Sequence, residues 1–133
     1  MPQDRETGAA GNDYGRDCGE IIANLLGATK VRAGRSSNEC VLGRKRVIIK
    51  CAKSKRRQQI GVYAHMFDRL DSVIAAFKNP DGSYHVYEMP LMTFQQLMRF
   101  REYENGDRGL MKRATFEERG TLLRTVSASQ IVH

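Results

Sequence analysis

A glutamate and a lysine near the middle of the chain have the residue types and spacing for phosphate chemistry. Glu39 and Lys50 lie in two apolar stretches on either side of a turn signal at residues 43–44. In a β-hairpin with this turn, Glu39 faces Ile48, and Lys50 is its diagonal neighbour on the same face, about 7–8 Å away. A carboxylate binds Mg²⁺ or Mn²⁺, and an ammonium group stabilises the negative charge that develops in phosphodiester cleavage. Glu20, on a preceding helix, is a candidate second carboxylate for the same metal ion.

The same region carries a concentration of positive charge. Between Lys30 and Arg57 there are eleven Lys and Arg residues and a single acid, Glu39, so the segment carries +10 whereas the whole chain carries +7. A polyanionic partner explains such a segment better than general solubility does. We therefore expect a nucleic-acid partner, double-stranded DNA in the first place. The expected phosphate-binding residues are Arg35, Arg44, Lys45, Arg46, Lys53, Lys55, Arg56 and Arg57.

Length and composition are those of a small folded protein. The chain has 133 residues, of which 41% are hydrophobic and 28% are charged, and this fits one domain with one core. We expect residues 1–15, which are polar and glycine-rich, to form a disordered tail, and residues 16–133 to form a single nucleic-acid-binding domain. No apolar run approaches the roughly 18 residues that span a bilayer, which predicts no membrane partner. Three cysteines without a paired motif predict reduced thiols and a cytoplasmic protein.

Apolar periodicity and turn signals predict the order of the elements. Asp17 as N-cap and Glu20 in the first turn predict a helix that ends at Gly27. The remaining expected elements are strands at 38–42 and 46–52, a loop at 53–59, a helix at 60–70, strands at 72–77 and 84–89, a helix at 93–101, and a strand, a helical turn at 115–119 and a strand within 110–126. This mixed order predicts a small α/β (α+β) domain with a central mixed β-sheet flanked by helices.

The strings SSNECVLGRKRVIIKCAKSK and DRLDSVIAAFKNPDGSYHVYEMP resemble the core of the PD-(D/E)XK, or restriction-endonuclease-like, superfamily over residues 17–90. In that family a helix with an acid precedes a strand that carries the first metal-binding acid, and the next strand holds an acid-x-lysine motif. The resemblance assigns Glu20 to the helix acid, Glu39 to the first metal-binding acid and Lys50 to the motif lysine. It implies a restriction-endonuclease-like core and a Mg²⁺-dependent or Mn²⁺-dependent nuclease. Symmetric cutting of both strands of a duplex would further require a homodimer.

One residue departs from the family's pattern. The motif acid is expected at position 48, where this chain has Ile48, so one expected metal ligand is missing. The site would use Glu39 and Glu20 alone, recruit another acid such as Asp68 or Asp71, or bind without cleaving. The sequence therefore leaves three functions open: a metal-dependent endonuclease, a non-catalytic nucleic-acid-binding regulator or accessory subunit, and a subunit whose basic segment docks on an acidic protein.

Overall fold

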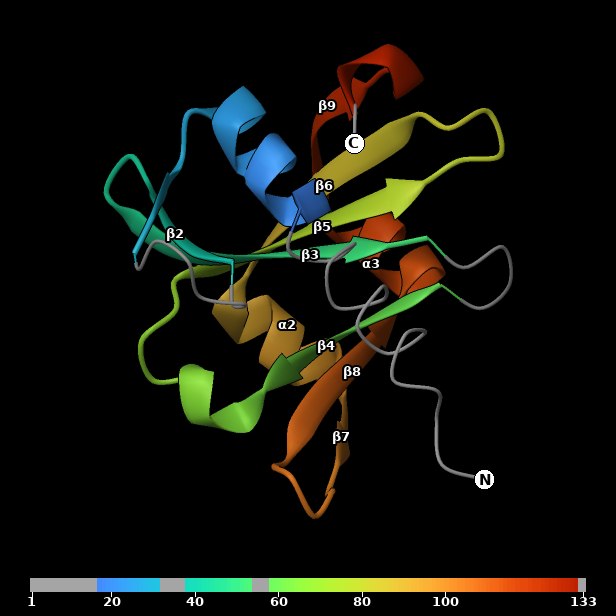
Figure 1. The fold of residues 1–133 in the computed structure, drawn as a ribbon. Coiled ribbons are helices and arrows are strands. Elements are labelled where there is room, and N and C mark those ends of the chain that lie inside the picture. Colours follow the sequence, from blue (N-terminus) through green and yellow to red (C-terminus); the bar gives the residue numbers. More distant parts are fainter. Residues whose placement is uncertain (1–16, 32–37, 54–57, 132–133) are drawn as a thin grey trace.

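Two β-sheets form the framework of the protein (Figure 1). The computed structural model describes residues 17–31, 38–53 and 58–131. The large sheet has six strands in the order β1 (Thr29–Lys30), β2 (Glu39–Leu42), β3 (Lys45–Ala52), β5 (Ser72–Lys78), β6 (Tyr84–Pro90) and β9 (Thr121–Val126). The small sheet has three strands in the order β4 (Gln59–Tyr63), β8 (Arg108–Lys112) and β7 (Arg99–Arg101). The pair β3–β5 is parallel and the other described pairs are antiparallel, which confirms the predicted mixed central sheet.

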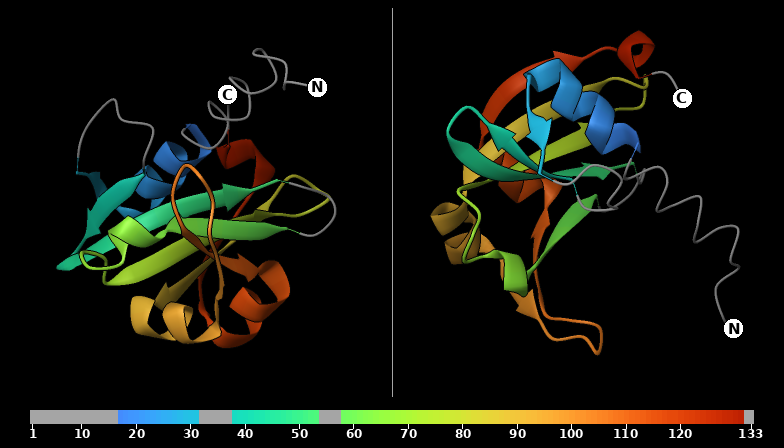
Figure 2. Two further views of the ribbon diagram at one scale, coloured as in Figure 1. Left: turned by 90° about the horizontal axis from the view of Figure 1, so that it is seen from below. Right: turned by 60° about the vertical axis from the view of Figure 1, so that its left-hand side comes forward.

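Helices lie on both faces of the large sheet (Figures 1 and 2). Residues 17–26 are helical and cover one face. The other face is covered by α2 (Leu91–Leu97), α3 (Arg113–Arg119) and the small sheet. Two short 3₁₀ helices, η1 (Ala64–Met66) and η2 (Ala128–Gln130), follow β4 and β9. The fold is therefore α+β, and no helix of the described residues is long and apolar enough to cross a membrane.

Strand β3 separates two hydrophobic cores because its side chains alternate between the faces of the sheet. Val47 and Ile49 belong to the core beneath the first helix, together with Ile22 of that helix. Ile48 belongs to the opposite core, together with Phe94 of α2. The β-branched run at residues 47–49 is typical of such a strand, which is buried on both faces.

Both hairpins of the large sheet have the predicted turns. Gly43, between β2 and β3, has φ of 63°, a left-handed conformation that glycine adopts without strain. The resulting register places Glu39 opposite Ile48 and Leu42 opposite Lys45, as predicted. The turn between β5 and β6 lies at residues 79–83 and contains Gly82 with φ of 88°. These local turns fix which side chains share a face of the sheet.

Three predicted elements differ from the structure. The prediction of a helix at 60–70 is wrong, since this segment contains β4 and η1. Ile60 and Val62 point into the core and alternate with outward-facing neighbours, which is the period of a strand. The helix expected at 93–101 begins and ends earlier, as α2, and its last residues form β7. Asp17 is itself helical rather than an N-cap. The predicted tail at residues 1–15 lies outside the described residues, whereas the predicted strand, helical turn and strand near the C-terminus are confirmed as β8, α3 and β9.

A cluster of polar side chains joins the small sheet to the end of β5. Gln58, just before β4, donates to the carbonyl oxygens of Ala52 at 3.2 Å and Lys78 at 3.0 Å. Arg113, at the start of α3, donates to Gln58 Oε1 and Asn79 Oδ1, both at 2.6 Å. Gln58 was placed in a polar loop by the sequence, but it is buried and its amide group bonds within the protein.

Candidate functional site

Two arginines neutralise Glu39, the single acid of the basic segment. Arg46 Nη1 of β3 donates to Glu39 Oε2 at 2.7 Å, and Arg69 Nε donates to the two carboxylate oxygens at 3.1 and 3.3 Å. The exposed fraction of the Glu39 side chain is 11%, compared with 38% for Arg46 and 45% for Arg69. The carboxylate is therefore enclosed, whereas both guanidinium groups remain partly open to solvent.

These contacts keep Glu39 ionised. Burial is the largest single influence on the pKa of Glu39 and acts to raise it. The hydrogen bonds and positive charges of Arg46 and Arg69 together outweigh burial, so the pKa of Glu39 lies below its ordinary value. A metal ion at this carboxylate would compete with two cations for oxygens that both already accept hydrogen bonds.

Glu20 and Glu39 lie on opposite faces of the large sheet. The first helix packs over the face that carries Val47 and Ile49, whereas Glu39 is paired with Ile48, on the other face. Glu20 accepts a hydrogen bond from Lys30 Nζ at 3.0 Å. In this arrangement the two carboxylates do not share one metal ion, and among the described residues no group of three or more His, Cys, Asp and Glu could hold one. The predicted Mg²⁺ or Mn²⁺ site stays a prediction.

The two other acids that the sequence offered have different environments. Asp71 Oδ2 accepts a hydrogen bond from the backbone N–H of Arg46 at 2.8 Å, which ties the start of β5 to the start of β3. Asp68 is exposed on the segment that follows η1. The Asp71 carboxylate therefore holds the backbone of β3 in place beside the Glu39–Arg46 ion pair.

Lys50 projects from the same face of the large sheet as Glu39. Glu39 is opposite Ile48, and Lys50 is two residues farther along β3. We call the polar residues of this row, Glu39, Arg46 and Lys50, the Lys50 face, whereas Ile48 between them is buried in the core. Lys50 is half-buried, and burial, followed by the nearby positive charge of Arg108, lowers the pKa of its ammonium group. The ion pairs of the described residues do not include Lys50, so two positive charges lie close together here.

Arg108 of β8 is held between two tyrosines. Its guanidinium carbon is 4.7 Å from the ring centre of Tyr63 and 4.8 Å from that of Tyr103. Its Nη2 donates to Asn105 Oδ1 at 3.2 Å, while its buried Nε has no hydrogen-bond partner within the described part of the protein. The rings fix the plane of the guanidinium group near Lys50. Arg108 could not be recognised from the sequence, because its proximity to Lys50 depends on contacts between strands far apart in the chain.

Among the described residues, the basic side chains predicted to contact phosphate lie near the two ends of β3. Arg44 is exposed in the turn before β3, and Lys45 beside it is ion-paired with Glu88 at 3.3 Å. Lys53 is exposed just beyond the other end. The predicted contacts Arg35, Lys55, Arg56 and Arg57 lie outside the described residues.

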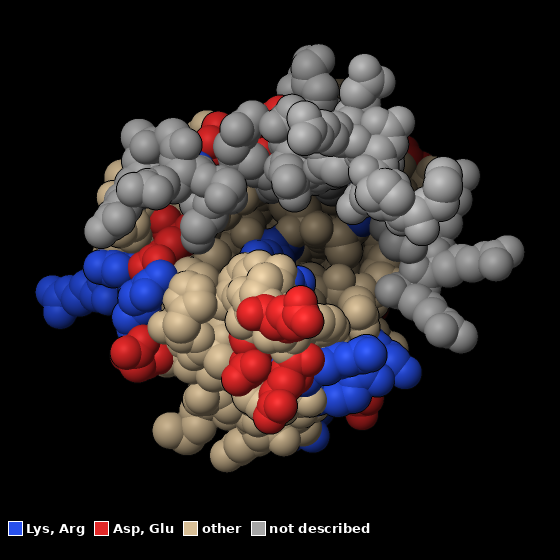
Figure 3. All heavy atoms as spheres, turned by 60° about the horizontal axis from the view of Figure 1, so that its bottom comes forward, with Lys and Arg blue, Asp and Glu red and all other residues tan. Residues whose placement is uncertain are grey.

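An acidic cluster lies on the lobe nearest the viewer in Figure 3. Lys and Arg side chains lie within a hollow and, together with further acids, at the sides of the molecule. The loop between β7 and β8, at the bottom of Figure 1, comes forward in this view and contains Glu102, Glu104 and Asp107. A polyanion would meet the hollow and its sides rather than this lobe.

No protein-family model matches the chain, and no curated protein sequence matches it significantly. The geometry of the Lys50 face therefore carries the functional argument.

Proposed function

We propose that this protein binds nucleic acid, double-stranded DNA in the first place, through the Lys50 face and the basic residues at the two ends of β3. The observation that carries this proposal is the arrangement of charge on the Lys50 face. The one acid of the basic segment is neutralised by two partly exposed arginines. Next to it, Lys50 and Arg108 form a pair of cations outside the described ion pairs. Phosphate groups are the natural partners of such an arrangement.

The proposed relationship to the restriction-endonuclease-like core has partial support. A helix, a hairpin with Glu39 and Lys50 on one face, and a later strand pair follow one another in the order expected for that family. The segment between β3 and β5 departs from it, since it contains β4 and η1 in place of a helix. The core is therefore proposed as a divergent form.

Metal-dependent DNA cleavage by a homodimer is the second candidate. It is favoured by the common face of Glu39 and Lys50, and disfavoured by the two arginines on Glu39. Incubation of plasmid DNA with the protein and Mg²⁺ or Mn²⁺ distinguishes the candidates. Cutting by the wild-type protein that is lost in both Glu39→Ala and Lys50→Ala would establish the nuclease. A plasmid that stays intact with either metal would favour the non-catalytic binding protein.

Nucleic-acid binding should depend steeply on salt. If about six basic side chains contact phosphates, the association constant on duplex DNA should fall as roughly the fifth power of the salt concentration. Fluorescence anisotropy with a short DNA duplex over a salt series measures this slope. A protein without affinity for DNA or RNA at low salt would contradict the proposal and favour an acidic protein as the partner of the basic segment.

Lys50→Met should weaken DNA binding while it stabilises the fold. The lowered pKa of Lys50 means that its charged form destabilises the folded protein below the folded-state pKa. This cost disappears as the pH rises from the folded-state to the unfolded-state pKa. We expect Met to increase the free energy of unfolding at neutral pH by about 1 kcal/mol and to weaken binding about 8-fold at about 0.1 M salt. Urea denaturation and anisotropy measure the two effects.

The exposed Lys78, at the end of β5, provides the control for this substitution. Lys78→Met removes the same charge outside the Lys50 face and should change both quantities little. If Lys50→Met were less stable and bound DNA normally, Lys50 would serve the fold rather than binding.

A further inference from the structure

The outward face of the small sheet carries four cations. Directly opposed residues in antiparallel strands share a face. In the β4–β8 pair, Gln59 is opposite Lys112 and Tyr63 is opposite Arg108. In the β7–β8 pair, Arg99 is opposite Leu110 and Arg101 is opposite Arg108. The alternate residues Ile60, Val62 and Met111 belong to the core, so the first set faces outward. We call this surface, with Arg99, Arg101, Arg108 and Lys112, the basic sheet face.

Three of its four cations are available to a ligand. Arg99, Arg101 and Lys112 are exposed, and the described ion pairs do not include them. The register positions of this face in β4, β7 and β8 include no acid. The acids of this part of the chain lie in the β7–β8 loop instead. Arg99 and Arg101 are two residues apart on one strand, hence about 6.8 Å apart, which is comparable to the separation of successive phosphates along a nucleic-acid strand.

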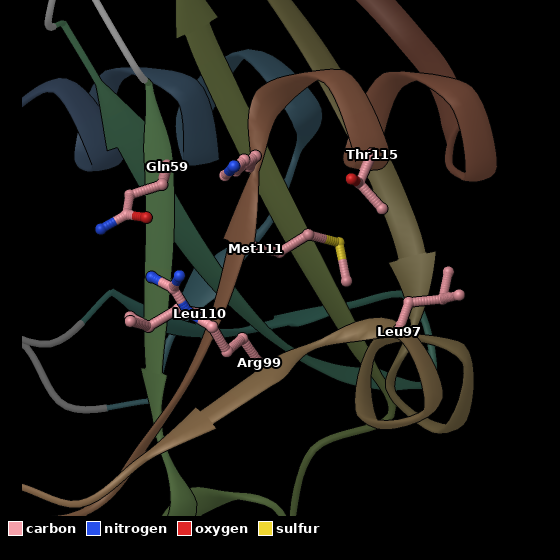
Figure 4. A pocket seen from close by; sticks show the side chains of 7 residues that line it. Gln59, Leu97, Arg99, Leu110, Met111 and Thr115 are labelled. Atoms are coloured by element: carbon pink, nitrogen blue, oxygen red, sulfur yellow. The ribbon is translucent and has the colours of Figure 1, made fainter.

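A pocket adjoins this face where strand β7 begins (Figure 4). Because β7 begins at Arg99 opposite Leu110, the last residues of β8 extend beyond it. The pocket there has a volume of about 270 Å³. In Figure 4, Leu97 of α2 and Thr115 of α3 lie on one side of it, and Gln59, Arg99 and Leu110 lie on the other. Met111 and Lys112 complete the lining, so two cations, two neutral polar groups and three apolar side chains surround a space without an acid.

This lining chemistry fits a phosphate group. Arg99 and Lys112 supply positive charge, while Gln59 and Thr115 supply uncharged hydrogen-bond donors. The small sheet begins beside the end of β3, because Gln58, just before β4, donates to the carbonyl oxygen of Ala52 at 3.2 Å. The positive charge of Arg108 also lies near enough to Lys50 to lower the pKa of its ammonium group, an effect second to that of burial. The two surfaces are therefore adjacent, and one nucleic-acid chain could cross both.

We propose that the basic sheet face is a second phosphate-binding surface for nucleic acid, with one backbone phosphate held in the pocket between Arg99 and Lys112. The inference rests on the proposed nucleic-acid-binding function and extends it beyond the basic segment at residues 30–57. The bound chain runs from the Lys50 face, past Arg108, onto the small sheet. Contacts of this kind position the ligand without reading its sequence.

The test removes the two pocket charges in Arg99→Gln/Lys112→Gln and measures duplex DNA binding by anisotropy over a salt series. Losing two phosphate contacts should lower affinity about 60-fold at about 0.1 M salt and reduce the salt slope by about 1.8. The matched control is Lys78→Gln/Arg119→Gln, which removes two exposed cations outside both surfaces. Arg101→Gln, on the same face but outside the pocket, is a second variant and should lower affinity about 8-fold.

The outcomes separate the two proposals. Wild-type protein that does not bind DNA overturns the proposed function and this inference together. Binding that the pocket variants keep, or that the control double variant loses equally, overturns the basic sheet face alone. Inorganic phosphate supplies the last arm: it should displace DNA from the wild-type protein more than chloride does at equal ionic strength, but not from Arg99→Gln/Lys112→Gln. Equal displacement of DNA from the wild-type protein by the two anions would overturn the pocket contact.

Discussion

Glu39→Gln is expected to tighten DNA binding and destabilise the fold at the same time. The substitution keeps the size of the side chain but removes the charge that neutralises Arg46 and Arg69. Both arginines are partly exposed, so a phosphate group can replace the lost carboxylate. One additional phosphate contact should raise affinity about 8-fold at about 0.1 M salt and steepen the salt slope by about 0.9. Anisotropy over a salt series measures both changes.

The same substitution should lower the free energy of unfolding by about 1–2 kcal/mol at neutral pH. The loss is smaller than for a fully buried pair because the two arginines retain water contacts. The pKa of Glu39 is lowered in the folded state, so the ionised carboxylate stabilises the folded protein. This stabilisation is fully present at pH values above the ordinary pKa of 4.5 and is lost as the pH falls through the folded-state pKa. The difference between wild type and variant should therefore shrink below about pH 4.5.

Glu118→Gln is the matched control for this pair of effects. Glu118 is exposed on α3, and its replacement changes the net charge equally without releasing an arginine. Its stability should stay within about 0.5 kcal/mol of wild type. If Glu39→Gln instead left affinity unchanged and abolished metal-dependent cutting, Glu39 would be a metal ligand and the proposed role as a neutralising acid would be wrong.

The hairpin around Glu39 could be predicted because its determinants are local. Gly43 fixes a tight turn, and the strict alternation of strand residues then determines that Glu39 and Lys50 share a face. The β5–β6 hairpin was predictable for the same reason. Neither prediction required knowledge of any contact across the molecule.

The small sheet could not be predicted in this way. Ile60 and Val62 suit a strand, but Val62, Met66 and Leu70 also recur at the spacing of a helix, so the pattern is ambiguous. Pairing with β8, nearly 50 residues later, decides the outcome. The partners of the candidate site are equally non-local: Arg69 reaches Glu39 from the segment after η1, and Arg108 approaches Lys50 from β8. Local patterns therefore predicted that Glu39 and Lys50 share a face but not which charges surround them.

Arg113→Ala is expected to be the most destabilising of the substitutions considered, because Arg113 joins three parts of the fold. It donates to Gln58 Oε1 before β4, to the carbonyl oxygen of Lys78 at the end of β5, and to Asn79 Oδ1 in the following turn, at 2.6, 3.1 and 2.6 Å. It is also paired with Glu117 of its own helix. Removing it leaves the buried Gln58 without its charged donor. We expect a loss of about 3 kcal/mol, measured by urea denaturation.

Arg119→Ala, at the other end of α3, is the control for this substitution. It makes the same change in helix propensity and net charge but removes none of these hydrogen bonds. Arg119 is exposed, so its replacement should change stability by less than about 0.5 kcal/mol. Arg113→Ala should also weaken DNA binding although Arg113 is on neither proposed surface, because the small sheet would no longer be fixed relative to Lys50. A loss of stability below about 1 kcal/mol would show that the core alone holds the two sheets together. A large loss with unchanged affinity would show that binding does not require the small sheet to be held against the large one.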